Sequence, residues 1–275
     1  MKKVSVLDTD FISKAHSIRS DDNTCLIDRI MELPGYHFCC HKQTKTELAR
    51  HDSSAPGWLD ESIKNGRIEE YTDDRLIREM SGLYFKLGTS IYTSFLRNAC
   101  DAFDRKYFDK HYSQLGTLDH FDTSDQDYLN LIKTLDDKIG EGNNLGEIKE
   151  YIVLQWMNRL NDEQAFYFCS DDRNARNGIL SVEGISVQCI SIPSVFQRLI
   201  SEGVFTAKDA RAYTDGAVNY FHAHKQENIR VIEASDIGRH MRVPCSQVFD
   251  DIIGGKFIEL PSGLLKYRRA IQPDS

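Results

Sequence analysis

Short apolar runs separated by segments with helical periodicity are the feature that most restricts the fold of this chain. Residues 4–7, 36–40 and 165–169 are rich in apolar, aromatic or β-branched side chains, which is typical of buried strands. A further strand is predicted within 184–192. From residue 147 onward, apolar residues recur at i, i+4 and i+8, which places them on one face of a helix. Strands that alternate with helices predict an α/β fold with a mainly parallel central sheet.

The spacing of these elements divides the chain into a large body and a small C-terminal part. The alternating pattern predicts a first domain over residues 1–200. Within it, residues 75–120 have mixed helical periodicity and many aromatic side chains, so we interpret them as a helical insertion. Residues 201–224 are expected to form a helical connector, and residues 225–275 a small module.

The C-terminal module has the element order of a winged-helix domain. A short capped helix is predicted at 235–238, and Pro244 then begins a second helix that ends at 254–255. A hairpin is predicted over 257–269. The module contains these cationic residues: Arg239, Arg242, Lys256, Lys266, Arg268 and Arg269. Nearby acids offset their charge, so two interpretations stay open: a winged-helix-like module that binds nucleic acid, and an appendage that only packs.

Composition limits the class of protein. The mean hydropathy is −0.46 and no long apolar run occurs, so no membrane span is predicted. Seven cysteines form no recognisable disulfide framework, which favours a reducing, cytoplasmic setting. The formal net charge of −8 is not that of a generally basic nucleic-acid-binding chain. A chain of this charge that binds nucleic acid requires a local basic surface.

Acidic residues fall where strands of a parallel sheet end. Asp8 follows the first strand, Glu47 lies in the helix after the second, and Glu147 begins a helix. Asp171 and Asp172 follow the strand at 165–169. The carboxyl ends of parallel strands share one edge of the sheet, so these acids are expected to converge. Converging carboxylates repel one another unless a divalent cation such as Mg²⁺ or Mn²⁺ binds them. The alternative is that each acid caps a helix or faces solvent.

A short His/Cys cluster at residues 37–41 is the competing metal motif. His37, Cys39 and His41 would lie on the opposite face of a strand from Cys40. No second Cys pair follows at the spacing of a zinc finger. We therefore expect an ordinary buried strand here.

Four segments resemble the motifs of PIN-domain nucleases, in the same order. Residues 6–12 (VLDTDFI) resemble the opening of those domains, where a strand ends in Asp-Thr-Asn or Asp-Thr-Asp. Residues 46–48 (TEL) are similar to the second acidic position, and residues 144–147 (NLGE) to the third, in its Gly-Glu variant. Residues 168–176 (FCSDDRNAR) resemble the fourth, in its Asp-Asp-x-x-Ala-Arg form. The resemblance covers the first domain and leaves its helical insertion unmatched.

The resemblance implies a PIN-like α/β/α sandwich with an active site that holds Mg²⁺ or Mn²⁺. Carried over by position, the metal ligands would be Asp8, Glu47, Glu147 and Asp172. Asp171 lies next to Asp172 and would share or replace its role. A water activated by the metal would then attack a phosphodiester bond.

Residues beside these acids receive supporting roles from the same resemblance. Ser170 takes the place of a threonine next to the metal ligands, and Asp10 would either support the ligands or cap a helix. Arg173 and Arg176 follow the acidic pair on one helix face. They would hold substrate phosphate or pair with neighbouring carboxylates, and the sequence leaves both roles open.

The main functional hypothesis is therefore a metal-dependent endonuclease that hydrolyses phosphodiester bonds, with RNA favoured over DNA. One alternative is a non-catalytic nucleic-acid-binding or regulatory protein with a PIN-like body. Another is the toxin-like half of a toxin–antitoxin pair, whose partner would be an antitoxin or another protein. Small PIN proteins often pair, so a homodimer is among the expected assemblies, and a membrane is not an expected partner.

Overall fold

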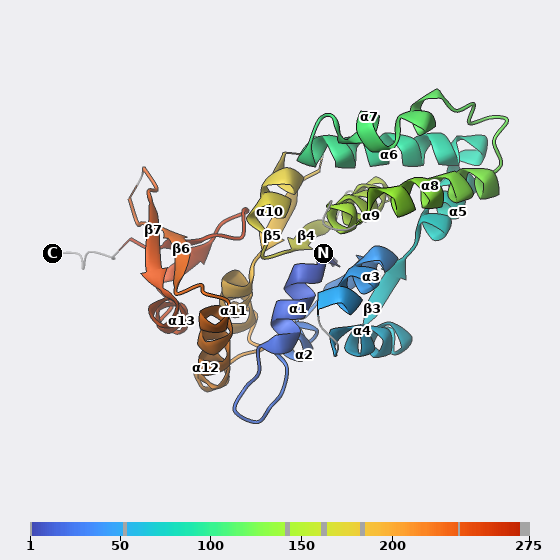
Figure 1. Ribbon diagram of the computed structural model, residues 1–275. Coiled ribbons are helices and arrows are strands. Elements are labelled where there is room, and N and C mark those ends of the chain that lie inside the picture. The colour runs from blue at the N-terminus through green and yellow to red at the C-terminus, as the bar shows by residue number, and fades with distance from the viewer. Residues whose placement is uncertain are drawn as a thin grey trace. The chain divides into compact units, whose positions relative to one another are not determined.

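The computed structural model describes residues 2–51, 54–140, 144–160, 164–181, 185–235 and 237–269. It confirms an α/β fold with a five-stranded, all-parallel central sheet flanked by helices, in the strand order β3-β2-β1-β4-β5 (Figure 1). The strands are β1 (Lys3–Leu7), β2 (Tyr36–His41), β3 (Ile68–Tyr71), β4 (Ala165–Cys169) and β5 (Val187–Ile190). The predicted strand at 184–192 is thus shorter than expected, and residue 184 lies outside the described ranges.

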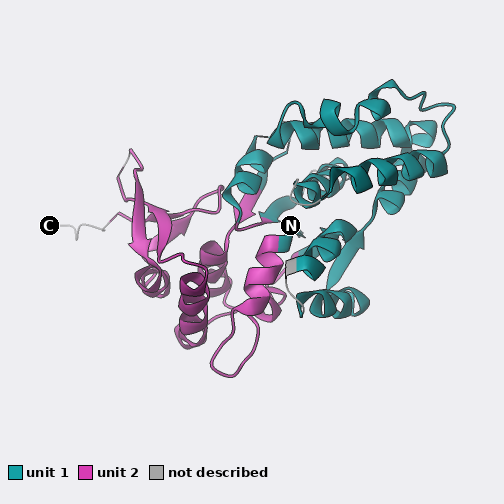
Figure 2. Ribbon diagram, in the orientation of Figure 1, with its two compact units in different colours: residues 1–9, 37–168, 172–187 teal, residues 10–36, 169–171, 188–275 magenta. Residues whose placement is uncertain are grey.

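The chain divides into two compact units (Figure 2). Unit 1 comprises residues 1–9, 37–168 and 172–187. Its helices are α3 (Lys42–His51), α4 (Ala55–Lys64), α5 (Asp73–Tyr84), η1 (Phe85–Leu87), α6 (Gly88–Phe103), α7 (Tyr107–His111), η2 (Ser113–Thr117), α8 (Asp125–Ile139), α9 (Leu145–Leu160) and α10 (Arg173–Leu180). The segment predicted to be a helical insertion is helical, and α8 extends it.

Helix α9 lies at the centre of unit 1. It contacts α3, α6 and β1. Its side chains are buried from Leu145 to Met157, except for Glu147, so the helix is enclosed on all sides. Two charged residues, Lys149 and Glu150, are enclosed with it at 1% and 0% exposure. Buried charges require partners or a shifted pKa, and these two residues therefore mark polar sites inside the unit.

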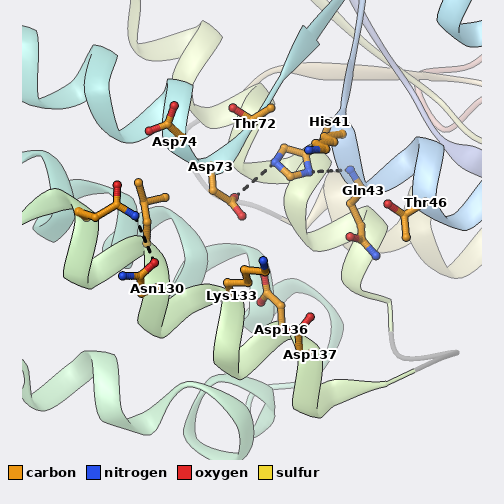
Figure 3. Close-up of a pocket in the computed structure, with 13 residues that line it drawn as sticks. His41, Gln43, Thr46, Thr72, Asp73, Asp74, Asn130, Lys133, Asp136 and Asp137 are labelled. Atoms are coloured by element: carbon orange, nitrogen blue, oxygen red, sulfur yellow. Dashed lines mark hydrogen bonds and ion pairs between the residues drawn. The ribbon is translucent and has the colours of Figure 1, made fainter.

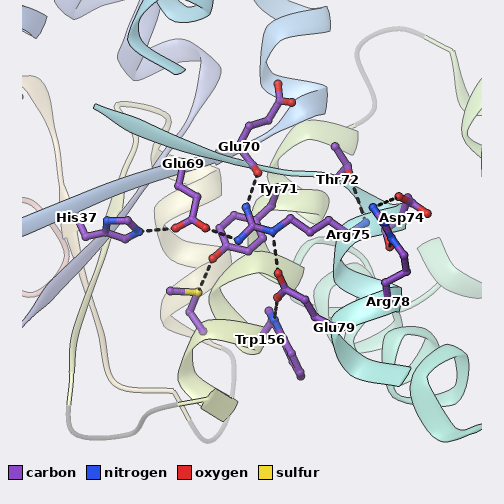
Figure 4. A network of polar contacts seen from close by, with 11 residues as sticks. His37, Glu69, Glu70, Tyr71, Thr72, Asp74, Arg75, Arg78, Glu79 and Trp156 are labelled. Atoms are coloured by element: carbon purple, nitrogen blue, oxygen red, sulfur yellow. Dashed lines mark hydrogen bonds and ion pairs between the residues drawn. The ribbon is translucent and has the colours of Figure 1, made fainter. Parts of the chain in front are cut away.

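A network around Arg75 fixes α5 to β3 and α9 (Figure 4). The Arg75 guanidinium pairs with Glu69 of β3, and it lies 4.0 Å from the centroid of the Tyr71 ring. It also donates to Glu79 Oε1 at 2.7 Å. The indole N–H of Trp156 donates to the other oxygen of Glu79 at 2.7 Å. Each polar atom of this network thus has a charged or hydrogen-bonding partner, which suits its half-buried position.

Unit 2 comprises residues 10–36, 169–171 and 188–275. Its helices are α1 (Thr9–Ser17), α2 (Leu26–Ile30), α11 (Ile192–Ser201), α12 (Ala207–Ala223) and α13 (Cys245–Ile253). A second sheet has the order β7-β6-β9-β8, with β6 (Asn228–Ile232), β7 (His240–Pro244), β8 (Phe257–Glu259) and β9 (Leu265–Tyr267). The rings of Phe196 and Phe249 lie 4.8 Å apart, and Phe221 stacks on Phe249 at 6.1 Å, which joins α11, α12 and α13.

The C-terminal module differs from its predicted order at one place. The helix expected at 235–238 is absent from the described residues 235, 237 and 238, of which 235 and 237 form a bend, while residue 236 lies outside them. Gly238 has φ +62° and its N–H bonds to the Ser235 carbonyl, so the segment turns and joins β6 to β7. The helix after Pro244 and the final hairpin are confirmed. Since two strands precede that helix, the winged-helix prediction is not confirmed.

The described residues contain neither a membrane-spanning helix nor a disulfide bond. No helix among the described residues is long and apolar enough to cross a membrane. All seven cysteines are buried, and none of them forms a disulfide bond.

Candidate functional site

Asp8 and Thr9 stand at the carboxyl end of β1. Asp8 is 2% exposed. The Thr9 hydroxyl donates a hydrogen bond to Glu47 Oε2 at 3.1 Å, and Glu47 belongs to α3, which begins directly after β2. The ends of two neighbouring strands of the sheet thus bring an aspartate and a glutamate of the predicted site into the same region, as expected for a parallel sheet.

Glu147 lies in the first turn of α9, next to a glycine that has no room for a side chain. A Cβ built on Gly146 would lie 2.8 Å from Glu47 Cδ and closer still to its Oε2. The Glu47 carboxylate therefore rests against the backbone of α9. The Gly-Glu pair of the sequence thus has a physical reason: the glycine allows α3 and α9 to approach.

Glu150 is a member of the site that was not predicted from the sequence. Its Oε1 accepts a hydrogen bond from the Thr44 hydroxyl at 2.7 Å, and its Oε2 is buried without a hydrogen-bond partner. Burial raises the pKa of Glu150 well above its ordinary value, and the negative charges of Asp8, Glu147 and Glu47 add to the rise. Glu150 follows Glu147 by three residues, which places both on the same side of a helix. This spacing, in a mostly apolar segment, is the sequence signal that could have identified Glu150.

We call Asp8, Glu47, Glu147 and Glu150 the carboxylate cluster. Within the described ranges, no group of three or more His, Cys, Asp or Glu side chains is already arranged to hold a metal ion. The donors are nevertheless carboxylate oxygens, which Mg²⁺ and Mn²⁺ prefer. The unpaired Glu150 oxygen suits a cation that would offset the mutual repulsion. The donor chemistry of the cluster thus suits such an ion, while the arrangement of the described side chains does not itself form a binding site.

The neighbouring acids at the end of β4 have structural partners. Asp171, in unit 2, accepts from Lys14 Nζ at 2.9 Å and from the Ile192 backbone N–H at 3.1 Å. Lys14 also pairs with Asp10 at 2.8 Å. Burial acts to lower the pKa of Lys14, but Asp171 and Asp10 raise it above its ordinary value. Asp10 lies in the first turn of α1 and pairs with Lys14 one turn along the helix, and its predicted role as a support for the ligands or as a helix cap stays a prediction.

Asp172 is the N-cap of α10. Its Oδ1 accepts from the backbone N–H of Asn174 at 2.6 Å and of Ala175 at 3.4 Å. Of the two arginines in α10, Arg173 is exposed and Arg176 is buried. The exposed guanidinium is the one available to a substrate phosphate. The role of Asp172 as a metal ligand stays a prediction.

Ser170, the other residue predicted to support the metal ligands, lies between the ends of two strands. Ser170 is fully buried, and its backbone N–H donates to the Ile190 carbonyl at 3.0 Å, within unit 2. This bond continues the ladder between the ends of β4 and β5. Its predicted role next to metal ligands stays a prediction as well.

A polar pocket in unit 1 is built around a second group of acids (Figure 3). Its volume is about 540 Å³, and its lining includes His41, Asp73 and Asp136. Lys149 Nζ is held 2.9 Å from Asp73 Oδ2 and 2.8 Å from Asp136 Oδ2. Burial would raise the pKa of Asp73, but the charge of Lys149 holds it well below its ordinary value. The buried lysine thus joins α9 to α5 and α8.

The orientation of His41 follows from its neighbours in this pocket. Its Nδ1 accepts the backbone N–H of Gln43 at 3.1 Å, so Nε2 carries the hydrogen of the neutral ring. Nε2 lies 3.3 Å from Asp73 Oδ1, but the two are not aligned for a hydrogen bond. We interpret this contact as electrostatic. The imidazole thus contacts both α3 and α5.

Comparison with known proteins gives no match: neither a family model, nor a curated protein, nor a solved structure is similar to the chain. The likeness to PIN domains therefore remains a resemblance of motifs.

The buried carboxyl of Glu150 gives a pH dependence with a definite sign. A carboxyl whose pKa is higher in the folded than in the unfolded chain contributes most to stability below its unfolded pKa, and that contribution is lost as pH rises through the folded pKa. We expect Glu150→Gln to raise the Tm of the metal-free protein at neutral pH and to flatten its decrease with pH. Thermal unfolding in chelator at several pH values between about 5 and 8 gives the Tm of both proteins as a function of pH.

A matched control is available in α4. Glu61 is exposed, so Glu61→Gln should leave both the Tm and its pH dependence unchanged. An unchanged or lower Tm for Glu150→Gln would show that Glu150 is stabilised in its charged form, which contradicts the assignment.

Proposed function

We propose that this protein is a metal-dependent nuclease that hydrolyses phosphodiester bonds, with RNA favoured over DNA. The observation that carries the proposal is the carboxylate cluster, in which Glu150 is buried among the negative charges of Asp8, Glu147 and Glu47 with one oxygen unpaired. The motif resemblance and the parallel sheet, which is compatible with a PIN-like α/β/α sandwich, support it.

The side chains of the cluster have separable roles in this proposal. Asp8, Glu47 and Glu147 would hold a Mg²⁺ or Mn²⁺ ion, with Asp172 as the further ligand that the resemblance implies. When bound, the ion would supply Lewis-acid polarisation of the scissile phosphate and a water of lowered pKa. Thr9 orients the Glu47 carboxylate through its hydroxyl.

Glu150 has a positioning role. Its hydrogen bond from Thr44 ties α9 to α3, the two helices that carry Glu147 and Glu47. It therefore sets the separation of these two carboxylates.

Cleavage of a mixed set of labelled substrates tests the function. Transfer RNA, single-stranded RNA, and single- and double-stranded DNA would each be incubated with the protein in Mg²⁺, in Mn²⁺ and in chelator. We expect cutting in metal and none in chelator, with RNA cut fastest. Binding of nucleic acid without cutting in any metal would contradict the proposal and favour the non-catalytic alternative.

Gly146→Ala is expected to affect activity without unfolding the protein. The new methyl would meet only the far end of the flexible Glu47 side chain, so the free energy of unfolding should change by no more than about 1 kcal/mol, the scale of helix propensity. Because Glu47 must move, cleavage should decrease by about 10- to 100-fold. Initial rates, measured beside a urea titration, give both quantities.

Gly57 in α4 provides the control. A Cβ at Gly57 meets nothing within 4 Å, so Gly57→Ala should retain wild-type cleavage. Full activity of Gly146→Ala would mean that the position of the Glu47 carboxylate does not matter, and Glu47 would lose its role as a ligand.

A further inference from the structure

The outer face of the small sheet in unit 2 gathers cationic side chains. The register pairs Arg230 of β6 directly with Arg242 of β7. Lys266 of β9 is paired with Ile232, two positions from Arg230, and therefore lies on the same face. We define the outer face by these residues: Arg230, Ile232, His240, Arg242, Ile258 and Lys266. None of them is acidic.

This face is open, whereas the opposite one belongs to the core. Ile229, Val231 and Val243 of the opposite face are at most 5% exposed, and α13 packs against β6 and β7 (Figure 1). On the outer face, Arg242 is exposed and Arg230 is half-buried. The cationic groups are therefore within reach of a ligand in solvent.

Two arginines opposite one another are unfavourable for the sheet itself. Like charges at directly paired positions destabilise a sheet, and opposite charges stabilise it. Within the part of the chain that the structure describes, Arg230, Arg242 and Lys266 form no ion pair with an acid. Stabilisation of the sheet therefore does not explain why these three cationic side chains lie together. Their positive charge is available to an anion.

We propose that the outer face binds the sugar-phosphate backbone of nucleic acid. A row of phosphates presents repeated negative charges, and neighbouring strands about 4.8 Å apart present repeated positive ones. Ile232 and Ile258 are the two aliphatic residues of the defined face, too few for membrane insertion, which favours nucleic acid over a lipid surface. The identity of the ligand rests on the proposed nuclease function, and the face would be its local basic surface despite the net charge of −8.

Binding in the absence of cleavage tests this inference. The full chain in chelator would be titrated against labelled single-stranded RNA by fluorescence anisotropy at several salt concentrations. We expect the double variant Arg230→Gln, Arg242→Gln to raise Kd on the order of tenfold at low salt. The slope of log Kd against log salt should decrease by about 0.7 for each phosphate of the single strand that the variant no longer neutralises. Its Tm should be unchanged or higher, because a like-charge pair has been removed.

Arg211→Gln is the matched control, since Arg211 is an exposed arginine of α12 in the same unit. Equal Kd values and salt slopes for the double variant and for Arg211→Gln would overturn the inference. Charge-dependent binding to vesicles containing phosphatidylserine, with none to RNA or DNA, would also overturn it. If the double variant weakens binding while wild type cuts no substrate, the nuclease proposal fails and the nucleic-acid face stands.

Discussion

Replacing Asp8 with asparagine is expected to reduce metal-dependent cleavage by about 10²- to 10³-fold while the protein stays folded. Asparagine has the size of aspartate, so the buried position at the end of β1 keeps its packing. The substitution removes one negative charge from the carboxylate cluster, and a loss of several kcal/mol of transition-state stabilisation corresponds to this decrease in rate. The substrate panel in Mg²⁺ and Mn²⁺ measures it.

Metal binding offers a readout of Asp8→Asn that is independent of turnover. The rise in Tm on addition of Mn²⁺ should be smaller in the variant than in wild type, because the cation loses a ligand. Asp60→Asn is the control: Asp60 pairs with Lys45 on the surface, and such pairs contribute about 0–1 kcal/mol. Wild-type activity in Asp8→Asn would contradict the proposal that the carboxylate cluster is the active site of a nuclease.

Lys149→Met is expected to destabilise the protein by about 3–5 kcal/mol, which is typical of removing one partner of a buried ion pair. Lys149 is 1% exposed and lies within 2.9 Å of both Asp73 and Asp136. Methionine fills a similar volume but leaves two carboxylates without a cation. For a chain of this size, the Tm should decrease on the order of ten degrees. Thermal and urea unfolding measure both quantities.

Lys133→Met separates this effect from a general loss of positive charge. Lys133 is exposed at the rim of the same pocket and should be replaceable with a change of about 0.5 kcal/mol or less. If Lys149→Met were as mild, the two aspartates would be neutral or solvated in the folded protein, and the pocket would need a different electrostatic description.

The elements that carry Asp8, Glu47 and Glu147 were predictable from local patterns. β1 and β4 end where the predicted apolar runs end. These features depend on neighbours within one or two turns of the chain. The acids at strand ends were likewise visible, because the edge of a parallel sheet follows from the order of elements.

Features that depend on distant partners were not predictable. Periodicity gave α9 one apolar face, but the helix is enclosed on all sides, so Lys149 and Glu150 are internal and not solvated. The partner of Lys149, Asp73, lies 76 residues earlier. β6 and β7 were missed for a similar reason. Their pairing requires the turn at Gly238, whose polar sequence also suits the start of a helix.

Helix α9 also determines how this protein can change over evolutionary time. Successive residues in a helix are rotated by about 100°. Lys149 and Glu150 are adjacent, yet each serves a different group of acids on a different side of the helix. Inserting one residue before them would place the lysine in the carboxylate cluster, and deleting one residue would place the Glu150 carboxylate among the aspartates. Descendants of this chain can therefore vary the length of their loops. They cannot vary the length of the first turns of α9, because Lys149 and Glu150 must each face their own group of acids.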